Sequence, residues 1–223
     1  MKTLAIITQK GGAGKTTIAT ALAVAAQAAG KNTAILDLDD QATSCFWSDI
    51  REAPTPTVRD VKAVRLPHTL EALENAGCDL AILDCPAIHR DIAMDAASPS
   101  DFVLIPTRAD VFDIRSMRQT VDMMKSIHKP CAVVLNFCPP SGQEVDQAKS
   151  LIQKLGVEVC PVEIHHRKAY ARAQQQGMTA QETEPSSLAA QEIIALYTYT
   201  HKQLAKQEKD HGKETEGRLV SGA

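Results

Sequence analysis

A glycine-rich segment between two lysines has the residue types and spacing that are most specific for chemistry in this sequence. The segment is Gln9-Lys10-Gly11-Gly12-Ala13-Gly14-Lys15-Thr16-Thr17. It follows an apolar stretch typical of a strand and precedes an alanine-rich stretch typical of a helix. Backbone N–H groups in such a loop, together with the positive end of the helix, converge on an anion, and glycines let the backbone come close. The segment predicts a loop that binds the phosphates of a nucleotide.

The residues of this loop have separate expected roles. Lys15 is expected beside the β- and γ-phosphates, the Thr16 hydroxyl on Mg²⁺, and Thr17 on the α-phosphate. The ordinary pattern GxxxxGK[ST] is not met, because Gln9 stands where it has glycine. An additional lysine, Lys10, precedes the glycines instead.

Three carboxylates follow apolar runs further along the chain. Asp37 and Asp39 end the run that begins at Thr33, and Asp84 directly follows Leu80–Leu83. The carboxyl edge of a parallel sheet is where α/β proteins bind ligands. An apolar strand that ends in aspartate is typical of the second magnesium-binding element of nucleotide-binding proteins. The alternatives are an acidic solvated loop for the first pair and a helix cap for Asp84.

The elements that must position these residues alternate between short apolar runs and longer helical patterns. Expected strands cover Leu4–Thr8, Thr33–Leu38, Leu80–Leu83, Phe102–Pro106, Ala132–Asn136 and about Val157–Val162. Expected helices cover Ile18–Ala29, about Leu70–Asn75, about Ile114–Ile127, Glu144–Leu155, about His166–Gln176 and Ser187 to about Lys206. This order predicts an α/β fold of the P-loop NTPase type, with a mostly parallel twisted sheet and helices on both faces. We expect one domain over residues 1–206, a surface connection at Glu52–Thr57, and a disordered polar tail over 207–223.

Composition excludes several classes of protein. The net charge of −3 and a pI near 6.2 argue against a surface covered in positive charge, so any contact with DNA needs a local patch. The six cysteines form no CxxC pair, which favours reduced thiols over disulfides or a cysteine metal site. A signal peptide and an apolar run of about 20 residues are both lacking, so we expect a cytoplasmic protein without a membrane anchor.

Four segments together resemble the ParA/MinD family of deviant Walker ATPases, over roughly residues 2–205. They are the Lys10–Thr16 loop, Asp37-x-Asp39-x-Gln41 with Asp40 where the family has proline, Asp84-Cys85-Pro86, and the stretch from Gly177 to Ala190. The resemblance implies that Lys10 reaches the phosphates of a facing subunit. It also implies that Asp39 activates the attacking water, that Asp37 supports the Mg²⁺ site, and that Asn136 contacts the adenine base.

Within that family the chain is most similar to the short ParA partition proteins. It has no paired cluster cysteines, no basic and apolar carboxyl-terminal helix, and no DNA-reading domain before the loop. The resemblance implies an ATP-dependent homodimer that binds non-specific DNA on the nucleoid and is stimulated by a ParB-like protein. The expected DNA contacts are Arg167, Lys168 and Arg172, with Lys202 and Lys206 as secondary candidates.

Three other functions stay open at this point. The first is an ATPase that positions a protein assembly, such as a conjugation complex, a chemotaxis array or a microcompartment. The second is a MinD-like factor. The third is a small-molecule P-loop kinase, which Lys10 disfavours.

Overall fold

The computed structural model describes the backbone of residues 1–87 and 89–220, and side chains as far as residue 206. Its described residues contain a seven-stranded sheet in the order β3-β2-β4-β1-β5-β6-β7, in which all paired strands are parallel. The strands are β1 (Lys2–Ile6), β2 (Thr33–Asp37), β3 (Thr57–Asp60), β4 (Leu80–Asp84), β5 (Phe102–Arg108), β6 (Cys131–Cys138) and β7 (Glu158–His165). The predicted fold class is therefore confirmed.

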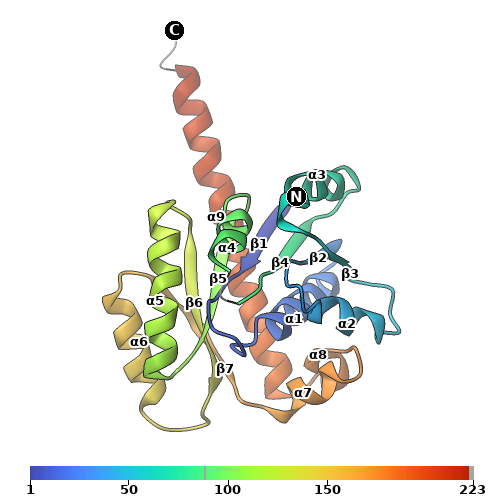
Figure 1. The fold of residues 1–223 in the computed structure, drawn as a ribbon, viewed down its shortest axis with the longest axis vertical. Helices are drawn as coiled ribbons and strands as arrows, with labels where there is room; N and C mark the ends of the chain where they lie inside the picture. Colours follow the sequence, from blue (N-terminus) through green and yellow to red (C-terminus); the bar gives the residue numbers. More distant parts are fainter. Residues whose placement is uncertain (88, 221–223) are drawn as a thin grey trace.

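Helices cover both faces of this sheet (Figure 1). They are α1 (Lys15–Ala28), α2 (Thr43–Asp49), α3 (Leu66–Asn75), α4 (Arg90–Ala97), α5 (Val111–Ser126), α6 (Glu144–Lys154), α7 (Lys168–Gln174), α8 (Ala180–Thr183) and α9 (Leu188–Val220), with a 3₁₀ turn η1 (Ala63–Arg65) before α3. Successive residues of a strand face opposite sides. In β1, Leu4 and Ile6 pack in the core shared with α1 and α9, whereas Ala5 packs in the core shared with α3 to α6.

The strand order brings the predicted site residues to one edge. Strand β1 lies between β4 and β5, and it is the point at which the direction of strand order reverses. The register pairs Ile6 with Asp84 and Asp37 with Asp84. The phosphate loop after β1 therefore lies beside both strand-terminal carboxylates, at the type of position where open α/β sheets bind ligands.

Several elements differ from expectation. The surface connection Glu52–Thr57 leads into β3, an exposed edge strand whose only large apolar side chain is Val58. Helices α2, α4 and α8 were not expected, because each has fewer than nine residues and too little sequence for a helical period.

The carboxyl-terminal helix is longer than expected, whereas disorder of the polar tail over 207–223 stays a prediction. Helix α9 continues through Val220 rather than ending near Lys206, and residues 221–223 lie outside the described residues. Lysine, glutamate and glutamine have high helix propensity, so a helix that is already packed can extend into polar sequence. One domain over residues 1–206 stays a prediction. Among the described residues, no helix is both long and apolar enough to span a bilayer.

Candidate functional site: a phosphate loop with carboxylates

The loop between β1 and α1 has an open, glycine-dependent backbone. Gly12 and Gly14 have φ angles of 71° and 88°, in the left-handed region that favours glycine. A Cβ atom at Gly14 would lie 2.2 Å from Nδ2 of Asn136, so a side chain does not fit there. Within the described chain no side chain caps α1 at Gly14, and the N–H groups of its first turn are available to an anion.

Lys15 and Thr16 begin α1 at the base of this loop. The Lys15 side chain is buried, and the Thr16 hydroxyl donates to Oδ2 of Asp84 at 2.6 Å. Ser44 donates its own hydroxyl to the same oxygen at 2.8 Å. The other oxygen, Oδ1, is buried and has no hydrogen-bond partner among the described residues. A buried carboxylate oxygen without a partner fits a ligand of a hard cation such as Mg²⁺.

Burial raises the pKa of Asp84 to about 6, against the opposing effect of the Thr16 and Ser44 hydroxyls. Burial likewise raises the pKa of Asp37 above its ordinary value. Asp37 accepts from the backbone N–H groups of Asp39 at 3.1 Å, Ser44 at 2.8 Å and Cys45 at 3.2 Å. Two buried carboxylates therefore lie at this edge without a cation from the protein paired directly to either among the described residues, which is an environment that favours a bound metal.

Asp39 and Asp40 occupy the loop after β2. Asp39 is partly exposed, and its Oδ1 accepts from the backbone N–H of Gln41 at 3.0 Å. Asp40, which stands where the family has proline, is exposed and pairs with Lys62. The Lys62 hydrogen bond lowers the pKa of Asp40. Asp40 therefore forms a surface ion pair on the outer side of this loop, and such exposed pairs contribute little to stability.

Lys10, at the start of the loop, contacts helix α5 of its own subunit. Its Nζ is 2.7 Å from Oδ1 of Asp113 on α5; the Lys10 side chain is 45% exposed and that of Asp113 only 5%. Arg108, at the end of β5, lies beside this pair and donates to the Gly12 carbonyl at 2.7 Å. The Arg108 guanidinium also stacks 4.7 Å from the centre of the Phe137 ring.

The sequence did not predict three residues of this region, Arg108, Asp113 and Ser44. A polar residue at a strand end was the available signal for Arg108 alone.

Asn136, the predicted base contact, lies directly behind the loop. Its Nδ2 donates to the Ala13 carbonyl at 2.8 Å, and its Oδ1 accepts from the Phe137 N–H at 2.9 Å. A cavity of about 130 Å³ adjoins it. The cavity is lined by Thr17, Ile18, Asn136, Phe137, Ile164, His165, His166, Arg167, Tyr170, Ala171 and Ile193. The adenine contact stays a prediction, and this cavity is the space in which it would be made.

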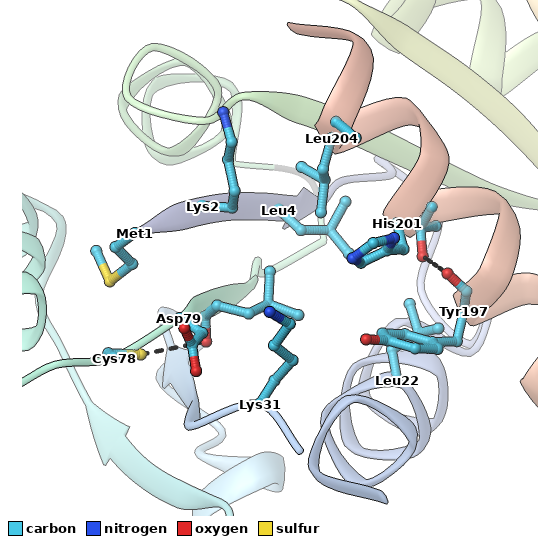
Figure 2. Close-up of a pocket in the computed structure, with 13 residues that line it drawn as sticks. Met1, Lys2, Leu4, Leu22, Lys31, Cys78, Asp79, Tyr197, His201 and Leu204 are labelled. Atoms are coloured by element: carbon cyan, nitrogen blue, oxygen red, sulfur yellow. Dashed lines mark hydrogen bonds between the residues drawn. The ribbon is translucent and has the colours of Figure 1, made fainter. Parts of the chain in front are cut away.

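A second cavity, of about 410 Å³, lies at the opposite edge of the sheet (Figure 2). It opens where β1 and β4 begin, and Tyr197, His201 and Leu204 of α9 line one side. None of the predicted site residues lines it. A larger cavity, of about 590 Å³, lies beside the glycine loop, where Lys10, Arg108 and Phe137 contribute to its lining.

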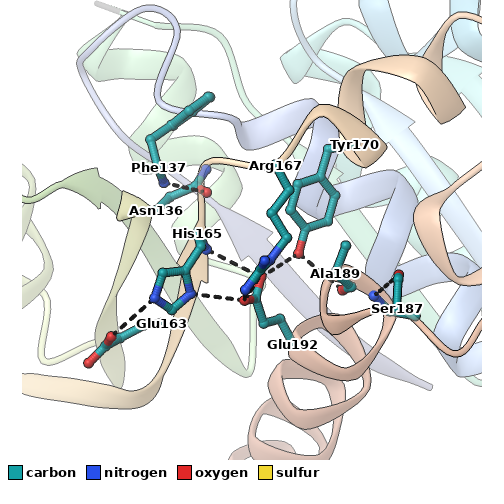
Figure 3. A network of polar contacts seen from close by, with 10 residues as sticks. Asn136, Phe137, Glu163, His165, Arg167, Tyr170, Ser187, Ala189 and Glu192 are labelled. Carbon is teal, nitrogen blue, oxygen red and sulfur yellow. Dashed lines mark hydrogen bonds and ion pairs between the residues drawn. The ribbon is translucent and has the colours of Figure 1, made fainter. Parts of the chain in front are cut away.

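The predicted DNA-binding residues have different environments in the structure. Arg167 donates from Nε and Nη2 to Oε1 of Glu192, at 2.9 and 2.6 Å (Figure 3). Glu192 also accepts from the Tyr170 hydroxyl at 2.8 Å. The charge of Arg167 is thus already compensated. Lys168 and Arg172 lie exposed on α7, four residues apart, and their role as DNA contacts stays a prediction.

Comparison with known proteins finds one matching family model and several relatives of 25–28% sequence identity. Residues 4–180 match the family model described as the CobQ/CobB/MinD/ParA nucleotide binding domain. The chain is 28% identical to maintenance of carboxysome distribution protein A of Halothiobacillus neapolitanus, over 79% of this chain and 85% of that one. It is 27% identical to protein virC1 of Rhizobium radiobacter, over 80% and 82%, and 25% identical to a protein ParA of that species, over 77% and 81%.

Solved structures share the fold at low sequence identity. Apo McdA of Cyanothece superposes with a TM-score of 0.74 at 18% identity, over 93% of this chain and 99% of that one. MinD of Pyrococcus horikoshii, complexed with Mg-ADP, gives a TM-score of 0.71 at 19% identity, over 92% and 98%.

Proposed function

Because this chain belongs to the CobQ/CobB/MinD/ParA family of nucleotide-binding domains, we propose that it is a Mg²⁺-dependent ATPase that dimerises on ATP and partitions DNA. In this proposal the ATP-bound homodimer binds DNA non-specifically on the nucleoid, and a ParB-like protein stimulates hydrolysis. The observation that carries the proposal is the different placement of two lysines at one loop. Lys15 is buried at its base, whereas Lys10 is half-exposed on its outer side. A lysine in the second position is suited to a phosphate that belongs to a facing subunit.

The chain's own groups suit a triphosphate. The loop N–H groups and Lys15 would bind the phosphates, and Thr17 lines the cavity beside them. Thr16 and Asp84 would hold Mg²⁺, with Asp37 in support. When bound, the metal neutralises charge on the phosphates. A homologous fold has been solved with Mg-ADP, and Cyanothece McdA with ATP, which supports this choice of ligand.

Asp39 is suited to orient the attacking water. It lies on the loop after β2 and is partly exposed. One of its oxygens accepts from the Gln41 N–H, and the other has no hydrogen-bond partner within the described part of the chain. A carboxylate in this position accepts a hydrogen bond from water and contributes modestly, as in a slow ATPase that needs a partner for full activity. Asp39→Ala is expected to keep ATP binding and lose turnover.

The nucleotide site is tested by Lys15→Ala. Loss of a charge-assisted hydrogen bond costs about 1.5–3 kcal/mol, so binding of ATP with Mg²⁺ should weaken by roughly 10- to 100-fold. Equilibrium binding of a fluorescent ATP analogue measures this. Lys31→Ala, which removes an exposed lysine at the opposite edge of the sheet, is the control. Parental affinity in the Lys15 variant would overturn the nucleotide assignment.

A second candidate function is the positioning of a protein assembly rather than DNA. Two observations favour it: the curated relatives include two maintenance of carboxysome distribution proteins, and the charge of Arg167 is already paired with Glu192. This second candidate needs no DNA contact from α7. For the remaining alternatives, a MinD-like factor and a metabolite kinase, neither of these two observations applies.

DNA binding separates the two candidates. If the partition proposal holds, unrelated duplex DNA is retained with ATP but not with ADP. Joint replacement of Lys168 and Arg172 by alanine should then weaken retention. The slope of log affinity against log salt concentration should fall by an amount that corresponds to the loss of about two phosphate contacts. Arg118→Ala, an exposed arginine on α5, is the matched control. If the parental protein shows no ATP-dependent retention in a salt series, assembly positioning becomes the better description.

A further inference from the structure

The first turn of α2 contacts both carboxylates at the metal side of the site. The helix begins after Ala42, whose φ of 48° turns the chain, and no side chain caps it at that residue. Instead the N–H groups of Ser44 and Cys45 donate to Oδ2 of Asp37, at 2.8 and 3.2 Å. The Ser44 hydroxyl points to the neighbouring strand and donates to Oδ2 of Asp84 at 2.8 Å. Ser44 is completely buried.

We propose that Ser44 is a positioning residue for the magnesium site, and that it acts through Asp84; this rests on the proposed function. Oδ2 of Asp84 accepts from two hydroxyls, those of Thr16 and Ser44. Two donors on one oxygen fix the plane of the carboxylate and leave Oδ1 without a partner among the described residues. Groups that hydrogen-bond a metal-binding carboxylate orient it and raise metal affinity.

The helix that carries Ser44 is fixed at its other end as well. Trp47 is buried and its Nε1 donates to the Met178 carbonyl at 3.1 Å. Arg51, just beyond α2, donates to the Gly177 carbonyl at 2.9 Å and pairs with Glu182 at 2.6 Å. The Ser44 hydroxyl therefore sits on a preorganised support, which is what a positioning group requires.

Helix capping alone does not account for this side chain. The cap of α2 is made by the backbone N–H of Ser44 with Asp37, and alanine would preserve that bond. As far as the chain is described, the Ser44 hydroxyl contacts Asp84 on β4 alone. Replacing it by hydrogen removes one donor from Asp84 and leaves the cap in place, so metal binding and helix stability can be measured separately.

The test is Ser44→Ala, with Thr43→Ala as the matched control because Thr43 is the exposed hydroxyl one residue earlier on α2. Binding of a fluorescent ATP analogue is measured against Mg²⁺ concentration and again in EDTA. We expect the Mg²⁺ concentration for half-maximal binding to rise about 10-fold in Ser44→Ala. Binding in EDTA, and both measurements for Thr43→Ala, should match the parent.

Two results would overturn the proposal: a parental Mg²⁺ requirement in Ser44→Ala, or an equal loss of binding with and without Mg²⁺. Thermal unfolding without nucleotide first establishes that the variants are folded. If Ser44→Ala does not fold, Ser44→Cys keeps the volume with a weaker donor and is judged by the same two measurements. Failure of the parent to bind ATP at all contradicts the proposed function instead, so the two failures are distinguishable.

Discussion

Asp84 couples the stability of the nucleotide-free protein to pH. Burial raises its pKa from the model-compound value of 3.8 to about 6, so the folded state holds a proton that the unfolded state loses. Between about pH 4 and pH 6 the folded state binds more protons than the unfolded state, and stability falls as pH rises through that window. Above pH 6 the Asp84 carboxylate is ionised in both states, and the destabilisation caused by its raised pKa is complete.

Asp84→Asn should therefore stabilise the nucleotide-free protein at pH 7.5. The pKa difference of about two units corresponds to a gain of about 3 kcal/mol, which should fall to about half of that at pH 5 and to a small remainder near pH 4. Urea unfolding at the three pH values measures it. Asp95→Asn, an exposed aspartate on α4, is the control and should change little. A gain that is the same at all three pH values would contradict this origin.

Two of the residues that were not predicted, Ser44 and Asp113, are defined only by tertiary contact. Asp37, Asp39 and Asp84 were identifiable because each ends an apolar run, and Lys15 because it belongs to a local pattern. Ser44 and Asp113 have no such local sign. Their partners lie 40 and 103 residues away in the chain, counted from Asp84 and Lys10, and a short polar residue near the start of a helix is ordinary.

At the scale of elements, the turn between α7 and α8 fixes α2 by close backbone approach. Gly177 has a φ of 62°, and a Cβ there would lie 2.6 Å from the backbone of Arg51. The same turn accepts from Arg51 and Trp47. Two segments more than a hundred residues apart are therefore held together by a glycine that has room for no side chain.

Gly177→Ala should lower the free energy of unfolding by roughly 2–4 kcal/mol, from the left-handed backbone and the overlap together. Gly77→Ala is the matched control, because Gly77 has a similar φ of 78° and a Cβ would meet no atom within 4 Å. It should cost only about 1–2 kcal/mol. Denaturant unfolding of both variants decides the matter, and equal losses would show that the contact with Arg51 contributes nothing.

Pattern alone identified the elements that are long or fully apolar and missed those that are neither. Five of the six predicted strands are buried along almost their whole length, and burial on both faces leaves a continuous apolar signal. The sixth, β7, is an edge strand in which only Cys160 and Ile164 are buried. Strand β3 lies at the sheet edge and is mostly exposed, so selection for apolar residues is weak there. The length of α9 was also missed, since its far part carries no apolar period that distinguishes helix from coil.

At the scale of the whole molecule, Lys10 connects the single subunit to the proposed dimer. Lys10→Ala should leave ATP affinity of the isolated subunit close to parental and abolish ATP-dependent association. Sedimentation at several protein concentrations, with ATP and with ADP, measures this. Lys31→Ala, an exposed lysine at the opposite edge of the sheet, is the control. Dimers of the Lys10 variant at parental strength would remove this lysine from the interface.

The ion pair between Lys10 and Asp113 also bears on how ionic strength affects each stage of the proposed cycle. If Lys10 moves from Asp113 to a phosphate of the facing subunit, its positive charge stays paired with an anion before and after dimerisation. Asp113 also keeps a neighbouring cation, because Nε of Arg108 is already 3.9 Å from its Oδ2. Self-association should then respond weakly to added NaCl. Attachment to a polyanion releases counterions and responds steeply. A titration with NaCl would thus dissociate the protein from nucleic acid well before it separates the subunits.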